Sequence, residues 1–193
     1  MKNRVSGIQK RLEKTSEIIL GLESIIPDIN KVIEVISKCL IRGNKIILFG
    51  NGGSAADAQH IAAEFLGKYK IKRKSIAAIA LTANSSTITA IANDYDFVDI
   101  FSRQCESLVS NGDIVIGIST SGNSENVVKG LKTAKKNGGL IIGLLGNKGG
   151  KIKNIVDIPL IVNSISIPRI QEAHRVIYHI ICEIVEEEVT KIE

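Results

Sequence analysis

Five short, almost entirely apolar runs recur along this 193-residue chain, and stretches with helical spacing of apolar residues separate them. Strands of a parallel sheet read as continuous apolar runs, because helices bury both faces of such a sheet. The sequence therefore predicts an α/β fold, a three-layer sandwich with a five-stranded parallel sheet. The predicted strands are residues 45–49, 75–81, 113–119, 140–145 and 157–162, and residues 92–97 are expected to form a loop.

The first 43 residues predict helices. Apolar residues recur at roughly helical spacing from Leu12 to Ile26, Pro27 suits the start of a second helix, and Gly43 suits its end. A chain of this length is typical of one domain. We therefore expect residues 1–193 to form a single domain in which residues 1–43 are an added helical pair.

The composition argues against a nucleic-acid-binding surface. The net charge is +5, and the densest basic run is residues 68–74, KYKIKRK. Aromatic residues make up only 4% of the chain and Trp is absent, so side chains that could stack on bases are scarce. We interpret the basic run as a solvated loop between a helix and a strand rather than as a polyanion-binding patch.

Cysteine usage and hydropathy favour a cytoplasmic protein without a membrane partner. The three cysteines, Cys39, Cys105 and Cys182, are odd in number and form no C-x-x-C pair, so neither a fully paired disulfide framework nor such a zinc or redox motif is expected. No apolar stretch reaches about 18 uncharged residues, and the N-terminus lacks the apolar core of a signal peptide.

Two polar loops follow predicted strands, where ligands bind in open α/β sheets. Each loop leads into a predicted helix, whose free backbone amides and positive dipole end favour an anion. Ordinary helix capping by Ser121 or Ser124 is the alternative, but four hydroxyls in six residues exceed what a cap needs. We therefore predict a phosphate site from Asn51, Gly52, Gly53 and Ser54 in one loop and Ser119, Thr120, Ser121 and Ser124 in the other.

The first loop also matches a dinucleotide fingerprint, with Gly50, Gly52 and Ala55 at G-x-G-x-x-A spacing. That fingerprint expects an acidic residue about 20 positions later, which holds the ribose. The basic run occupies this part of the chain instead, so an NADP site stays open while an NAD site is disfavoured. A site for a phosphosugar requires only the phosphate-binding loops and no acidic residue for a ribose.

Two predicted helices carry histidine, carboxylate and amide side chains close together in the sequence. His60 and Glu64 are four residues apart and share a helix face. Gln171 and His179 are eight apart on the last helix, which places them about 80° apart around its axis. Spacing leaves two interpretations open: a functional group, or a surface His60–Glu64 ion pair with ordinary histidines beside it.

Four segments together resemble the phosphoheptose isomerases, a family of sugar isomerase (SIS) domain enzymes. They are GNGGSAADAQHIAAE, ANDYDFVDIFSR, GISTSGNSENV and RIQEAHRVIYH, in the family's order and spacing. The resemblance implies a Rossmann-like SIS fold and a homotetramer built around the N-terminal helices. It implies interconversion of sedoheptulose 7-phosphate and D-glycero-D-manno-heptose 7-phosphate through an enediol, the first step of activated heptose biosynthesis for lipopolysaccharide core, capsule or related glycans.

The resemblance also implies a role for individual residues. One zinc ion per subunit would be held by His60, Glu64, Gln171 and His179, which leaves His174 outside the ligand set. Glu64 and His179 would move the protons, with Asp94 as a helper or hydroxyl binder. The family's substrate contacts correspond to Asn51, Gly52, Gly53, Asn93, Asp94, Ser119, Thr120, Ser121, Ser124 and Gln171, and Glu64 would touch substrate as the base.

Two other functions are weighed against the isomerase. A close SIS relative in bacteria binds the replication initiator but lacks the equivalents of Glu64 and His179, and this chain has both. Sugar-phosphate-sensing regulators usually add a helix-turn-helix domain, and residues 1–42 do not resemble one. The isomerase is therefore the expected function.

Overall fold

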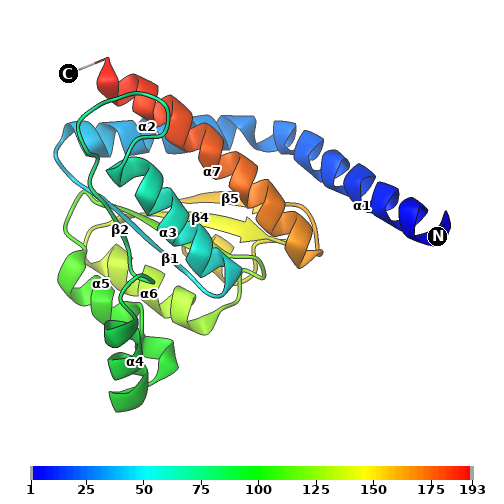
Figure 1. Ribbon diagram of the computed structural model, residues 1–193. Helices are drawn as coiled ribbons and strands as arrows, with labels where there is room; N and C mark the ends of the chain where they lie inside the picture. Colours follow the sequence, from blue (N-terminus) through cyan, green and yellow to red (C-terminus); the bar gives the residue numbers. More distant parts are fainter. Residues whose placement is uncertain (1, 192–193) are drawn as a thin grey trace.

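Five parallel strands form one sheet in the order β2-β1-β3-β4-β5 (Figure 1). The computed structural model describes residues 2–191. The predicted parallel sheet is confirmed, and only the second strand is much shorter than expected: β2 pairs with β1 over three residues. The strands are β1 (Ile46–Gly50), β2 (Ala78–Ala80), β3 (Ile114–Ser119), β4 (Leu140–Gly146) and β5 (Ile158–Val162).

Helices cover both faces of the sheet, which confirms the predicted three layers (Figure 1). One face carries α2 (Ile26–Ile41), α3 (Gly53–Leu66) and α7 (Ile167–Thr190). The other face carries α5 (Ser102–Leu108) and α6 (Glu125–Lys136), with α4 (Ser85–Asp94) and the short helices η2 (Phe97–Asp99) and η3 (Ile152–Asn154) packed beside them. The rings of Phe49 and Phe101 stack at 4.8 Å between β1 and the start of α5.

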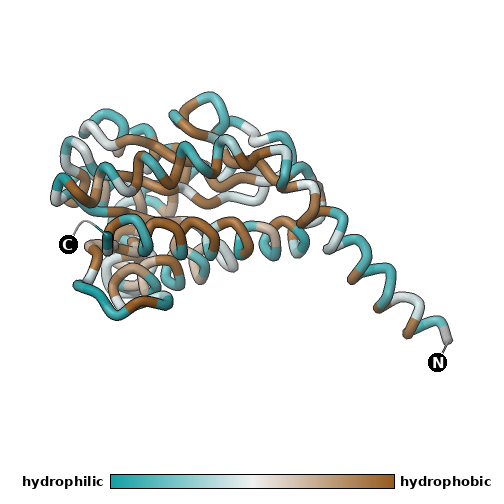
Figure 2. The backbone as a smooth tube through the Cα atoms, turned by 90° about the horizontal axis from the view of Figure 1, so that it is seen from above, coloured by the Kyte–Doolittle hydropathy of each residue, from teal (hydrophilic) through white to brown (hydrophobic). Residues whose placement is uncertain are grey.

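The N-terminal helices differ in how much of their surface packs against the rest of the molecule. Helix α1 (Lys2–Leu20) projects from the body of the molecule, and η1 (Gly21–Ile25) joins it to α2 (Figure 1). Arg169 at the start of α7 hydrogen-bonds the Thr15 hydroxyl and the Arg11 carbonyl, so the second half of α1 is anchored. Apolar segments recur along the projecting part (Figure 2), where Val5, Ile8 and Leu12 are exposed.

The loop expected at residues 92–97 is partly helical, because α4 continues through Asp94. Helix α4 begins with a side-chain cap, in which Asn84 accepts a hydrogen bond from the backbone N–H of Thr87. Such a cap satisfies one of the free amides of the first turn. The expected loop therefore begins only at Tyr95.

The basic run at residues 68–74 is not simply a solvated loop. The side chains of Arg73 and Glu186 are each 1% exposed, and Arg73 Nε lies 3.0 Å from a Glu186 carboxylate oxygen. The same carboxylate accepts hydrogen bonds from the backbone N–H groups of Tyr69, Lys70 and Ile71. The sequence interpretation was wrong for Arg73, because its partner lies 113 residues away on α7.

Candidate active site

Two histidines and a glutamate from two helices converge above one face of the sheet. His60 and Glu64 lie one turn apart on α3, and His179 lies on α7, which packs against α3. Each residue offers a potential ligand atom, and these atoms lie within 4.8 Å of one another. His60 Nε2 is 2.8 Å from Glu64 Oε1, and the rings of His60 and His179 meet edge to face at 5.2 Å. The His60–Glu64 pair is thus real, but it is part of a three-residue group.

The protonation of His179 suits a group that accepts a proton. Burial, and then the neighbouring imidazole of His60, lower the pKa of His179 below its ordinary value, while Glu64 opposes this shift. A histidine with a lowered pKa is neutral at pH 7. His179 can therefore accept a proton or offer a lone pair to a cation.

The donor set fits a zinc ion by its chemistry. Two imidazoles and one carboxylate are the protein ligands of one common type of catalytic zinc site, in which a further position stays open for water or substrate. All three side chains are half-buried rather than sealed, so this position is accessible to a ligand. The group could hold zinc on these grounds.

The side chain of Gln171, a residue of α7, lies against Gly53 at the start of α3. A methyl group placed on Gly53 would overlap the side-chain amide of Gln171, so the two residues are in close contact. Gln171 also lines a shallow hollow with Pro168, Glu172 and Arg175. The structure thus brings Gln171 from the last helix to the loop that the sequence singled out.

The serine loop is folded so that its hydroxyls face one another. Ser119 Oγ lies 3.1 Å from Ser124 Oγ and accepts a hydrogen bond from the backbone N–H of Gly122 at 3.2 Å. Gly122 has a φ of +66°, and a side chain there would strike the carbonyl of Gly149. Ser124 precedes α6 but forms no capping hydrogen bond with it, so capping does not account for its hydroxyl.

A reciprocal amide pair joins the two predicted phosphate loops. Asn51 Nδ2 donates to Asn126 Oδ1 at 2.8 Å, and Asn126 Nδ2 donates to Asn51 Oδ1 at 2.9 Å. The loops are neighbours because β1 and β3 pair side by side, with Gly50 opposite Ile118. This contact fixes the glycine loop relative to the start of α6. Gly52 is exposed at the turn, and Ser54 is buried in the first turn of α3.

Asn93 and Asp94 lie in a different part of the surface. Asn93 Nδ2 donates to Asp94 Oδ1 at 2.8 Å at the end of α4. Asp94 lines an open hollow of about 680 Å³ together with Tyr95 and Arg103, whose guanidinium stacks over the Tyr95 ring at 3.9 Å. Within the described residues, no hydrogen bond or ion pair joins Asp94 to the His60, Glu64 and His179 group.

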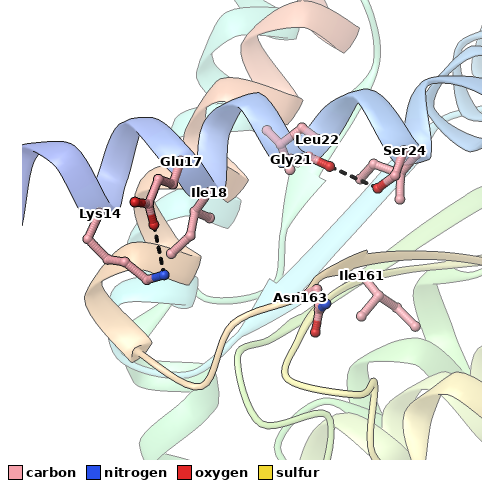
Figure 3. Close-up of a pocket in the computed structure, with 9 residues that line it drawn as sticks. Lys14, Glu17, Ile18, Gly21, Leu22, Ser24, Ile161 and Asn163 are labelled. Atoms are coloured by element: carbon pink, nitrogen blue, oxygen red, sulfur yellow. Dashed lines mark hydrogen bonds and ion pairs between the residues drawn. The ribbon is translucent and has the colours of Figure 1, made fainter.

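Another hollow, of about 250 Å³, lies between η1 and the end of β5 (Figure 3). Its charged residues, Lys14 and Glu17, pair with each other at 3.0 Å. Apolar side chains such as Ile18 and Ile161 share its wall (Figure 3). No histidine or cysteine is among the residues that line this hollow, and it is not the candidate active site.

Comparison with known proteins decides the family. The SIS domain profile matches residues 12–146. The phosphoheptose isomerase of Clostridium acetobutylicum is 50% identical over 188 residues, which are 97% of this chain and 96% of that protein. The corresponding protein of Geobacter sulfurreducens is 47% identical over 94% of this chain and 97% of its own. The chain belongs to the phosphoheptose isomerase family.

Solved structures agree with this assignment. A phosphoheptose isomerase from Francisella tularensis superposes with a TM-score of 0.92 at 34% identity and covers 95% of this chain and 98% of its own. The Neisseria gonorrhoeae phosphoheptose isomerase gives a TM-score of 0.89 at 37% identity and covers 96% and 98%. The resemblance and the SIS fold expected from the sequence are confirmed.

The phosphoheptose isomerase fold of this chain also holds polar residues that sequence reasoning missed. Tyr178 hydrogen-bonds His60 Nδ1 at 3.0 Å and is itself bonded to Asp57 and Arg175. Burial, and then the charge of Asp57, raise the pKa of Tyr178 to about 12, so its hydroxyl stays protonated. Tyr178 falls at a core position of α7, and nothing in its spacing distinguishes it from a packing residue. Asn126 was missed likewise, because its partner is 75 residues away.

Gly53 provides a test of the position of Gln171. We expect Gly53→Ala to displace the Gln171 amide and to lower kcat/KM by up to about 10²-fold, since small misplacements in an active site have effects of this size. Stability should be nearly unchanged, because Gly53 is exposed and the atoms nearest to its added methyl all belong to the Gln171 side chain. Steady-state kinetics and thermal unfolding measure both. Gly21→Ala is the matched control, since nothing lies within 4 Å of its added methyl. Unchanged kinetics in Gly53→Ala would remove Gln171 from the site.

The burial of His174 leads us to expect that the folded protein is less stable in mild acid. It is fully buried, its Nε2–H donates to the Leu145 carbonyl at 3.0 Å, and its Nδ1 has no partner in the described part of the chain. Burial lowers its pKa from 6.5 to about 4, against the smaller effects of Leu145 and Asp57. Between these two pH values the unfolded chain binds a proton that the folded protein does not.

The free energy of unfolding should therefore fall as the pH drops from about 6.5 to about 4, by up to about 1.4 kcal/mol per pH unit from this group. Urea unfolding at pH 7 and pH 5 measures this change. His174→Gln keeps a donor for the Leu145 carbonyl and removes the titration, so its pH dependence should be weaker. Equal pH dependence in both proteins would contradict a buried neutral His174.

Proposed function

We propose that this chain interconverts sedoheptulose 7-phosphate and D-glycero-D-manno-heptose 7-phosphate. The observation that carries the proposal is the convergence of His60, Glu64 and His179 on one face of the sheet, where α3 begins at the glycine loop that neighbours the serine loop. A phosphosugar isomerase needs a phosphate site at one end of its substrate and proton-transfer groups at the other. The relatives named phosphoheptose isomerase support the choice of substrate.

The reaction requires two proton movements. One hydrogen leaves C1 of the ketose and returns to C2 of the aldose through an enediol, and one hydroxyl proton moves from O1 to O2. A positioned carboxylate can carry the carbon-bound hydrogen as a proton, and a neutral imidazole can carry the hydroxyl proton. We assign these roles to Glu64 and His179, respectively.

The phosphate would bind at the serine loop. The hydroxyls of Ser119, Thr120, Ser121 and Ser124 are donors of the kind that phosphate oxygens accept. Free amides at the starts of α3 and α6 add a positive field. Asn51, Gly52, Gly53, Ser54 and Gln171 would line the sugar, and contacts to Asn93 and Asp94 stay predictions.

We further propose one zinc ion per subunit, held by His60, Glu64 and His179, with Gln171 as a fourth ligand. When bound, zinc stabilises negative charge on the substrate oxygens. Metal analysis of the wild type, His60→Ala and His179→Ala tests the ligand set. Equal metal content in all three proteins would show that the assignment is wrong.

We propose a homotetramer that uses α1. Val5, Ile8 and Leu12 are 66%, 54% and 66% exposed at helical spacing, so they form an apolar stripe on the projecting helix. Exposed apolar stripes of this kind mark interaction sites. Sedimentation equilibrium measures the mass in solution, and a monomer at micromolar concentration would contradict the proposal. No described helix is long and apolar enough to cross a membrane, and the cytoplasmic location stays a prediction.

The direct test supplies the purified, zinc-loaded protein with sedoheptulose 7-phosphate and, in parallel, a six-carbon ketose phosphate. We expect aldose to form from the seven-carbon substrate at the higher kcat/KM. Absence of conversion of the seven-carbon ketose would contradict the proposal. Equal kcat/KM on both sugars would retain the isomerase and correct its substrate.

A further inference from the structure

The hydroxyl of Tyr178 lies at the centre of a polar network behind His60. Tyr178 is 2% exposed, and its ring packs edge to face against both His60 and His179, with centroids at 5.5 Å and 4.7 Å. Its hydroxyl is within hydrogen-bond distance of three groups: Arg175 Nε and His60 Nδ1 at 3.0 Å and Asp57 Oδ1 at 3.3 Å. The hydroxyl thus connects the candidate metal group to a buried carboxylate.

Two arrangements of hydrogens satisfy this network. Arg175 can only donate, so it uses one lone pair of the Tyr178 hydroxyl in both of them. In the first arrangement, the hydroxyl donates to the Asp57 carboxylate and accepts a hydrogen from His60 Nδ1. In the second arrangement, the hydroxyl donates to His60 Nδ1 and His60 Nε2–H donates to Glu64.

Asp57 is held in place as this acceptor. Its side chain is 2% exposed, and Arg175 Nη2 donates to its Oδ1 at 2.9 Å, which compensates the buried charge. Arg175 therefore contacts both Asp57 and the Tyr178 hydroxyl. Arg175 keeps the charge of Asp57 paired in both arrangements, so the Tyr178 hydroxyl can donate to either Asp57 or His60.

An Nδ1–H on His60 determines what its other nitrogen can do. Nε2 then points at Glu64 Oε1 across 2.8 Å. A lone pair and a carboxylate oxygen repel each other at this distance unless a proton or a cation lies between them. A cation at the edge of His60 that faces Glu64 and His179 therefore requires the first arrangement, in which Nδ1–H donates to the Tyr178 hydroxyl.

We propose that Tyr178 is a positioning residue that accepts the Nδ1–H of His60 and holds its ring orientation when Nε2 is presented with Glu64 and His179 to a divalent cation. This inference rests on the proposed zinc site. Partners of this kind, which hold a metal-binding histidine through its other ring nitrogen, typically contribute 10- to 100-fold in metal affinity. Tyr178 acts through His60 and need not touch the substrate.

The test compares the wild type with Tyr178→Phe, which removes the hydroxyl and keeps the ring. We expect the zinc dissociation constant, measured by competition with a chelating dye, to rise by about 10- to 100-fold. Tyr69→Phe is the matched control: its ring also lies against His179, at 5.7 Å, and its hydroxyl has no hydrogen-bond partner in the described residues. Zinc affinity in Tyr69→Phe should equal that of the wild type.

A second readout follows the tautomer of His60 rather than the affinity. Nitrogen-15 NMR distinguishes Nδ1–H from Nε2–H, and we expect Nδ1–H in the zinc-loaded wild type, with faster exchange of this hydrogen with water in zinc-loaded Tyr178→Phe. A wild type that binds no zinc would contradict the zinc proposal itself. A wild type and a Tyr178→Phe variant that bind zinc with equal affinity and show equal exchange at Nδ1 would overturn the inference alone.

Discussion

Glu64→Gln is expected to lower kcat by about 10²- to 10⁴-fold, the range that a positioned acid–base group contributes. Gln has nearly the shape of Glu but cannot accept the proton from C1. The side chain of Glu64 is 22% exposed, and only His60 hydrogen-bonds it among the described residues, so the substitution should leave the fold intact. Discontinuous or coupled assays of aldose formation measure kcat, and the thermal unfolding midpoint, compared with that of the wild type, checks the fold.

Two measurements separate the roles of Glu64 as base and as metal ligand. Bound zinc is quantified in Glu64→Gln at saturating metal, and binding of inorganic phosphate is measured in parallel. Low turnover with zinc and phosphate still bound identifies the base. Glu187→Gln, an exposed substitution on α7, is the control and should behave as the wild type. Full turnover in Glu64→Gln would remove Glu64 from the mechanism.

Arg73→Met is expected to lower the free energy of unfolding by about 3–5 kcal/mol, because removing one partner of a buried ion pair leaves the other charge uncompensated. Arg73 does more than pair with Glu186. Its guanidinium donates to the backbone carbonyls of Phe65 and Glu64, at 2.9 Å and 3.0 Å, and so fixes the end of the helix that carries Glu64. Urea unfolding at pH 7 measures the loss.

The controls lie in the same basic run and on the partner residue. Lys72→Met changes an exposed cation and should alter stability by no more than about 0.5 kcal/mol. The double variant Arg73→Met/Glu186→Gln removes both charges and should recover part of the loss. A loss below about 1 kcal/mol in Arg73→Met would show that the pair is structurally unimportant.

Acid should weaken the ion pair between Arg73 and Glu186. Burial favours the neutral form of Glu186, but the three backbone N–H groups and Arg73 outweigh it and hold the pKa of Glu186 below its ordinary value. A carboxylate with a lowered pKa contributes its stability above the unfolded pKa, near 4.3, and loses it as the pH falls through the folded value. This contribution is separate from that of His174, which is lost at higher pH.

Sequence patterns sufficed for the fold because its signals are local. Each strand is a continuous apolar run, and each glycine or serine loop follows such a run directly, so the sheet and the sites at its edge follow from the order of segments. The N-terminal helices and α7 are likewise visible in their apolar spacing. Even so, the end of α4 at Asp94 was missed, because the Asn84 cap fixes where that helix begins but no local signal marks its end.

The candidate site could be predicted only in part, since it depends on contacts between distant segments. Helical spacing placed His60 beside Glu64 but left His179 on a separate helix, and only the family resemblance brought the three together. The Asn51–Asn126 pair and the Arg73–Glu186 pair join residues 75 and 113 positions apart, which no spacing rule detects. Tyr178 was hidden for another reason: its ring is a core residue, and only its hydroxyl contacts the site.

Isomerisation in heavy water tests the central claim most directly, because it follows the proton that Glu64 is proposed to carry. The wild type with zinc is incubated with sedoheptulose 7-phosphate in D₂O, and proton NMR follows C2 of the product. We predict formation of the aldose with deuterium at C2, since the half-exposed Glu64 exchanges its proton with solvent. Absence of the aldose would contradict the isomerase, and an aldose whose C2 hydrogen comes entirely from the substrate would contradict transfer by a Glu64 that exchanges its proton with solvent.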